Sequence, residues 1–222
     1  AYFQQVRGLA KQGFTDSLGL AAASLGWEAR LALRQKDHAR AIHLYLEQLA
    51  AGDGSAIESL RVTAATALEE SEALNSLAKD PITQKAITAY LISRGGGFRD
   101  AGLTSAGPLD ETALRWLEAV EAAGGADLDS AEKLALAAYQ AGAFDVARRW
   151  IKRAPGTPLA QWLQAKLLLR EGKVAAAAGI LVRISSQFPL DSTGTNAPAR
   201  LVDNLRSTFA DVTLSFALIF VF

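Results

Sequence analysis

The chain has 222 residues, is 50% hydrophobic, and carries 23 basic and 23 acidic side chains, so its formal net charge is zero. A nucleic-acid-binding protein normally has a basic excess that neutralises phosphates, and this balance argues against such a partner. Because cysteine is absent, a disulfide framework and a thiolate metal site are both excluded.

The sequence has no apolar run approaching the roughly 20 residues that a membrane-spanning helix needs. Methionine is absent, and the opening stretch AYFQQVRGLAKQGF already has the pattern of structured sequence. We therefore expect residues 1–222 to be a fragment or a processed product, with any targeting signal lying upstream. The alanine-rich, cysteine-free composition and the missing start favour a bacterial protein of the periplasm or cell envelope over a cytoplasmic one.

Helical spacing of apolar residues divides the N-terminal half into short helices. The predicted helices cover residues 2–12, 18–34, 41–50, 55–68 and 82–93. Asp16 or Ser17 is suited to cap the second of these helices. Asp80 is suited to cap the last one, with Pro81 at its first turn.

A glycine-rich segment, residues 94–108, is the clearest break in the chain, and we predict a long loop there. Asp110 then caps a helix that ends at Gly124. A further helix is expected over residues 201–209. The β-branched and aromatic residues 212–222 are typical of a strand. This tail is predicted either to pair with strands outside residues 1–222 or to cover the last helix as an apolar tail.

Residues 130–155 and 158–189 follow one helix-turn-helix template. When Ala147 is aligned with Ala177, Ala135 falls on Ala165 and Gly142 on Gly172. A proline follows the second helix in both stretches, at positions 155 and 189. The same order of residues therefore predicts two consecutive antiparallel helix pairs.

An N-terminal stretch fits the same alignment. Ala41 falls on Ala147 and Ala29 on Ala135, while Lys36 stands where the other two stretches have the turn glycine. The 106 residues from Ala41 to Ala147 are close to three periods of about 34 residues. We therefore expect degenerate repeats in the intervening sequence, where the template itself cannot be placed.

Small residues at the helix contacts, a turn glycine and a closing proline resemble the tetratricopeptide repeat, whose period is near 34 residues. The resemblance implies an all-α fold: an α-α superhelix, or solenoid, of antiparallel helix pairs over residues 1–189. Residues 190–222 would be a C-terminal extension that includes the short strand-like tail. The resemblance also implies a concave groove, lined by the first helix of each pair, that binds extended or helical peptides.

The predicted partner-binding residues are those that the resemblance places on the groove side of the first helices. They are Arg30, Arg34, Lys133, Tyr139, Gln140, Trp162, Lys166 and Arg170. The set is basic with aromatic interruptions, so an acidic peptide or a carboxylate end would complement it. The alternative is that all of them are ordinary solvated helix residues. The family's peptide-carboxylate clamp relies on groove asparagines, and their absence from these helices argues against a chaperone-tail adaptor.

Catalytic and metal-binding motifs are missing from the sequence. His38 and His43 would point about 140° apart on a helix, and no metal-binding motif surrounds them, so we expect solvated surface histidines. The glycines at 95–97 lack the Lys-Ser/Thr of a phosphate-binding loop, and no serine has a Gly-x-Ser-x-Gly setting.

Two further groups of side chains receive structural interpretations. The acidic cluster Glu69, Glu70 and Glu72 is expected to be a solvated helix end. The tryptophans at 27, 116, 150 and 162 lie on helical segments and are expected to pack in the interior.

The sequence therefore predicts a non-catalytic scaffold that binds a protein or peptide and needs no cofactor or metal. The alternative is that this helical region is the arm or ring of a larger enzyme acting on a cell-wall polymer. In that case the catalytic domain would lie outside residues 1–222.

Overall fold

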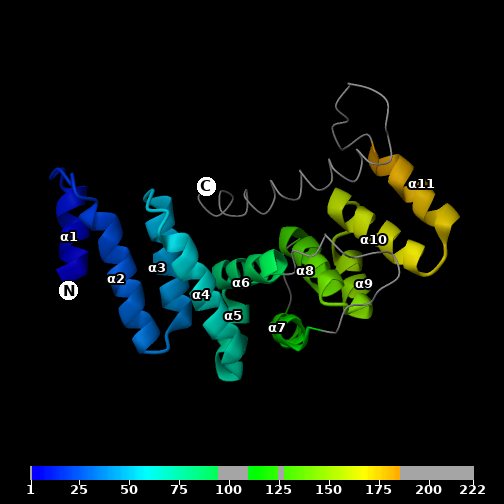
Figure 1. Ribbon diagram of the computed structural model, residues 1–222, viewed down its shortest axis with the longest axis horizontal. Coiled ribbons are helices and arrows are strands. Elements are labelled where there is room, and N and C mark those ends of the chain that lie inside the picture. The colour runs from blue at the N-terminus through cyan, green and yellow to red at the C-terminus, as the bar shows by residue number, and fades with distance from the viewer. Residues whose placement is uncertain (1, 95–109, 125–127, 186–222) are drawn as a thin grey trace. The chain divides into compact units, whose positions relative to one another are not determined.

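The computed structural model describes residues 2–94, 110–124 and 128–185, and in these ranges every regular element is an α-helix (Figure 1). The expected all-α class is confirmed for this part of the chain. The predicted loop beyond Arg94, the helix at 201–209 and the strand at 212–222 lie outside the described residues. The chain divides into two compact units, with the boundary between Tyr90 and Leu91.

Unit 1 is a run of short helices joined by tight turns. Asp16 accepts hydrogen bonds from the backbone N–H groups of Leu20 and Ala21, both at 2.7 Å, so the predicted cap is confirmed. The helix it caps starts at Leu20 rather than Leu18, because Gly19 takes a left-handed conformation with φ of 65°. The helices of this unit are α1 (Tyr2–Lys11), α2 (Leu20–Arg34), α3 (His38–Ala50), α4 (Ala56–Glu69), α5 (Ser71–Lys79) and α6 (Pro81–Arg94), the last of which crosses into unit 2.

Unit 2 begins its described helices after Asp110, which caps the first of them as predicted. Its carboxylate accepts hydrogen bonds from the N–H groups of Thr112 and Ala113 at 3.0 and 3.1 Å. The Asp110 N–H in turn donates to the carbonyl of Ala141, 3.2 Å away. The helices are α7 (Glu111–Ala122), α8 (Leu128–Gln140), α9 (Phe144–Arg153), α10 (Pro158–Arg170) and α11 (Val174–Ser185).

Three helix pairs, α2–α3, α8–α9 and α10–α11, share the predicted packing of alanines. The aligned positions are fully buried in every pair, with 0% exposure. A methyl group takes little space between two helices, so close approach of the helices favours a small residue such as alanine there. The six residues are Ala29, Ala41, Ala135, Ala147, Ala165 and Ala177.

The turns of the three pairs have the same backbone as well. Lys36, Gly142 and Gly172 all have positive φ, at 59°, 78° and 74°. In each turn the next residue's N–H donates to the carbonyl five residues earlier, at 2.9–3.0 Å, which is the outer hydrogen bond of a Schellman motif. Lys36 therefore replaces glycine in sequence without changing the turn.

Charged and aromatic side chains complete the cores of the two units. In unit 1 Glu28 of α2 is only 9% exposed and accepts hydrogen bonds from Arg7 of α1 and Arg40 of α3. Burial alone would raise the pKa of Glu28, but the hydrogen bonds and charges of the two arginines outweigh it and lower that pKa. In unit 2 Trp116 and Trp150 are completely buried.

Candidate interaction surface

Cations and aromatic rings, rather than metal-ligating groups, give the described surface its chemical character. Within residues 2–94, 110–124 and 128–185, no three His, Cys, Asp or Glu side chains gather closely enough to hold a metal ion. A set of cationic and aromatic side chains gathers instead on α8, α9 and α10 of unit 2. We call it the cation-aromatic cluster; its members are Tyr139, Phe144, Trp162, Lys166 and Arg170.

Helix α10 contributes three members of the cluster at intervals of four residues, so they follow one face of the helix. The Nζ of Lys166 lies 4.4 Å from the ring centroid of Trp162 and 5.6 Å from that of Tyr139 on α8. Trp162 is only 5% exposed. It therefore packs under the Lys166 side chain and offers little ring surface on which a ligand could stack.

Arg170 lies at the other end of the cluster, in the last turn of α10. Its guanidinium carbon is 4.2 Å from the centroid of the Phe144 ring, and that ring meets Tyr139 edge-on with centroids 5.5 Å apart. A guanidinium stacked flat on an aromatic ring keeps its N–H edges available for a planar carboxylate. The Phe144 ring thus orients Arg170, which is half-buried and also hydrogen-bonds the phenol of Tyr139.

Burial and the charge of Arg170 shift the pKa values of Lys166 and Tyr139. Burial lowers the pKa of Lys166, and the positive charge of Arg170 lowers it further. Burial raises the pKa of Tyr139, although the charge and hydrogen bonding of Arg170 partly oppose this. Two partly desolvated positive charges on one helix face create a positive potential that a bound carboxylate would relieve.

Several other arginines among the described residues form ion pairs with carboxylates. Arg148 pairs with Asp145 and Glu171, and Arg149 pairs with Glu121. In unit 1, Arg7 and Arg40 share Glu28, and Arg61 pairs with Glu58. By contrast, no carboxylate of the described residues pairs with Arg30, Arg34, Arg153 or Arg170. Arg153 lies over the buried Trp150 ring, with its guanidinium carbon 4.3 Å from the ring centroid. Arg30, Arg34 and Arg170 belong to the set predicted from sequence, and Arg153 does not.

The structure brings together only part of the predicted set. Tyr139, Trp162, Lys166 and Arg170 join the cation-aromatic cluster, whereas Arg30 and Arg34 are exposed on α2 of unit 1. Lys133 and Gln140 also lie on α8. The Oε1 of Gln140 is buried and accepts no hydrogen bond from the described residues.

Phe144 is the member that the sequence prediction missed. It is the first residue of α9, directly after the turn at Gly142, and so stands beside the end of α8. That position after a turn glycine is the signal that could have identified it. Its ring contacts both Tyr139 and Arg170, so the missed residue joins two members of the cluster.

The tryptophan prediction is confirmed at three positions and wrong at one. Trp116, Trp150 and Trp162 are buried, but Trp27 is 55% exposed. Trp27 lies on the side of α2 that faces away from the buried Leu25, and the guanidinium carbon of Arg30 is 4.7 Å from its ring centroid. Helical spacing alone did not reveal which side of α2 its neighbours cover.

The prediction of solvated histidines is wrong for His38 and only partly met by His43, whose side chain is 35% exposed. His38 is 4% exposed, with its Nε2 3.2 Å from the Glu70 carboxylate in a contact that lacks hydrogen-bond geometry. The Nε2 of His43 lies 2.8 Å from Asp80, the cap of α6. The junctions between α4, α5 and α6 place these carboxylates against α3, which a reading of one helix cannot anticipate. The contact with His38 is the main cause that lowers the pKa of Glu70.

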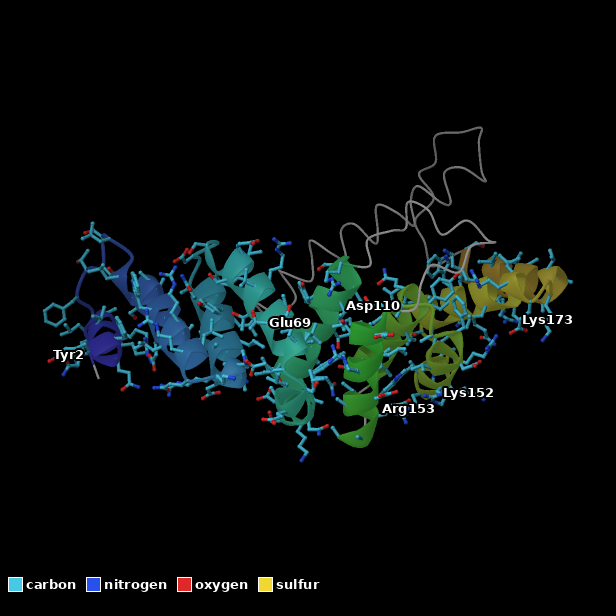
Figure 2. All side chains as sticks on the ribbon, turned by 60° about the horizontal axis from the view of Figure 1, so that its bottom comes forward. Tyr2, Glu69, Asp110, Lys152, Arg153 and Lys173 are labelled. Atoms are coloured by element: carbon cyan, nitrogen blue, oxygen red, sulfur yellow. The ribbon has the colours of Figure 1, made fainter. Side chains whose placement is uncertain are left out.

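A shallow depression also lies between the end of α9 and the start of α10. Its volume is about 290 Å³, at the lower limit for a small-molecule site. Figure 2 labels Lys152 and Arg153 at this end of α9. The depression is lined by Ile151, Lys152, Pro155, Gly156, Ala160, Gln161 and Gln164, with no acid, base and nucleophile arranged together.

The fold and the cluster define an all-α protein of packed helix pairs with a cationic, aromatic face. Comparison with known proteins gives no match: no protein-family model fits the chain, and neither the curated proteins nor the solved structures include a significant match. No helix among those described is both long and apolar enough to cross a membrane.

Proposed function

We propose that this protein is a non-catalytic interaction scaffold, built of tetratricopeptide-like helix pairs, that binds an acidic segment of a peptide or protein partner. The observation that carries the proposal is Arg170, which is stacked on Phe144 and has no carboxylate partner among the described residues. The binding face is the cation-aromatic cluster on α8, α9 and α10.

The charge of α10 favours an anionic partner. Its sequence, PLAQWLQAKLLLR, contains two cations and no acidic residue. A carboxylate of the partner would receive bidentate hydrogen bonds from Arg170, and Lys166 would add a second positive charge one turn away. The rings of Tyr139 and Phe144 provide apolar surface beside these charges. The cluster therefore suits a segment in which acidic residues alternate with apolar ones.

Crosslinking in the native host, on the complete protein, would test this function. Amine-reactive crosslinks at Lys133 and Lys166 are read by mass spectrometry in the wild type, in Arg170→Glu and in the control Lys152→Glu. Lys152 is exposed on α9 of the same unit, so the control makes the same type of charge reversal outside the cluster. We expect one recurrent partner, attached near an acidic segment, whose crosslinks fall at least about fivefold in Arg170→Glu only.

Two outcomes would contradict the proposal. Crosslinks that remain unchanged in Arg170→Glu would show that the cluster does not hold the partner. Crosslinks only to other parts of the same polypeptide would instead favour the helical arm of a larger enzyme.

A further inference from the structure

Helix α2 of unit 1 exposes a row of large apolar side chains on one side. Leu20 is 51% exposed, Trp27 55% and Leu31 46%. Single exposed hydrophobic residues are common on soluble proteins, but a row along one helix marks an interaction surface. We propose that this surface is a second docking site, and that its partner is an acidic amphipathic helix of another protein. We call it the α2 face; it consists of Leu20, Trp27, Arg30, Leu31 and Arg34.

The α2 face forms a ridge along one side of the helix, with the half-buried Ala23 between Leu20 and the other four side chains. With 100° between successive residues of a helix, its five side chains fall within an arc of about 100°. Leu25, Ala29 and Ala32, which are buried against α3 and α4, lie on the opposite side of α2. The ridge runs from Leu20 to Arg34, a length of about 21 Å at 1.5 Å per residue. A partner of about four helical turns would match it.

The chemistry of the ridge indicates the charge of its partner. Neither Arg30 nor Arg34 pairs with a carboxylate among the described residues. The only acidic side chain of α2 is Glu28, which is already shared by Arg7 and Arg40. The α2 face is therefore basic as well as apolar. A complementary surface presents Asp or Glu beside apolar side chains.

Trp27 is suited to be the energetic centre of such an interface. Tryptophan and arginine are the residues most enriched among those that dominate binding energies. Arg30 lies against the Trp27 ring and limits its freedom before a partner arrives, which reduces the entropy lost on binding. A helical partner fits better than a strand, because the ridge offers side chains and no open backbone edge.

This site does not rest on the proposed function of the cation-aromatic cluster. The α2 face belongs to unit 1, and the cluster belongs to unit 2. A substitution on the α2 face leaves every residue of the cluster intact. Failure of one proposal would therefore leave the other standing.

A display library of helical peptides, with random apolar and charged positions, is the probe for this proposal. The complete chain is the bait, and binders are then measured by fluorescence anisotropy. We expect the selected peptides to be amphipathic and acidic. Their dissociation constants should rise at least about tenfold with Trp27→Ala and with the double change Arg30→Glu, Arg34→Glu. Val62→Ala, at a 53% exposed position of α4, is the control and should change them less than about twofold.

Several results would overturn the proposal. One is a library that yields no binders, or binders that are basic or that bind the α2 variants equally well. Another is protection of Trp27 from iodide quenching in the free protein, because the chain itself would then cover the ridge. Self-association that disappears with Trp27→Ala would make a second copy the occupant. Binding of vesicles containing anionic lipid that depends on Trp27 would make a membrane the occupant.

Discussion

Replacing Ala177 with leucine tests the central feature of the fold, the alanine contacts within each helix pair. Ala177 of α11 and Ala165 of α10 are both fully buried, with Ile180, Leu168 and Leu169 packed around them. Leucine adds three carbon atoms at this fully buried position. Overpacking of this kind costs about 1–3 kcal/mol. With a urea m value of about 2 kcal/mol/M, the unfolding midpoint should fall by roughly 1 M.

Tryptophan fluorescence is a suitable measurement for this substitution. Trp116, Trp150 and Trp162 are all buried in unit 2, so the change in emission on unfolding reports mainly on that unit. Ala178→Leu is the matched control, since it makes the same change one residue later at an exposed position. An Ala177→Leu midpoint equal to those of the wild type and the control would refute the assigned contact between α10 and α11.

Three further substitutions give directional predictions. Lys36→Gly should stabilise unit 1 by about 0.5–1 kcal/mol, because a φ of 59° strains lysine but not glycine, and circular dichroism during urea unfolding would measure it. Glu28→Gln should destabilise unit 1 by about 1 kcal/mol at pH 7, a modest value because Arg40 is half exposed. Since the pKa of Glu28 is lowered on folding, its contribution is present above the unfolded pKa of about 4.3 and is lost as the pH falls through the folded pKa. The wild type should therefore lose stability below about pH 5 more steeply than Glu28→Gln, and equal slopes would contradict this assignment. Asp110→Ala removes two cap hydrogen bonds and should lower the stability of unit 2 by about 1 kcal/mol, measured by fluorescence.

The helix pairs could be predicted because their packing has a simple sequence signal. A small residue must stand where two helices touch, and a left-handed turn favours glycine. These requirements put alanine at equivalent positions of the two helix pairs, Ala135 with Ala165 and Ala147 with Ala177, whatever the neighbouring residues are. Residue spacing likewise placed Trp162, Lys166 and Arg170 on one face of α10, because it depends on a single helix.

The remaining parts of the candidate sites depend on contacts between helices. Phe144, the first residue of α9, contacts Arg170, the last residue of α10, because the packing of the helices brings these two ends together. His38 is buried because Glu70 and its neighbours come against α3 from a distant part of the sequence. The exposure of Trp27 follows from which sides of α2 the helices α1 and α3 cover. A periodic pattern defines an apolar side of a helix but not the helix that covers it.

The three-residue turns affect how the chain folds during synthesis and how it extends under force. The most extensive helix contacts are those between α2 and α3, α8 and α9, and α10 and α11, each pair adjacent in sequence. Contacts between near neighbours form quickly, because little loop entropy is lost in making them. Each hairpin could therefore close as it leaves the ribosome, before the next one has been made. When the chain is pulled from its ends, we expect it to lengthen in steps. Each step would be the unfolding of one hairpin, whose 30 residues extend to about 100 Å.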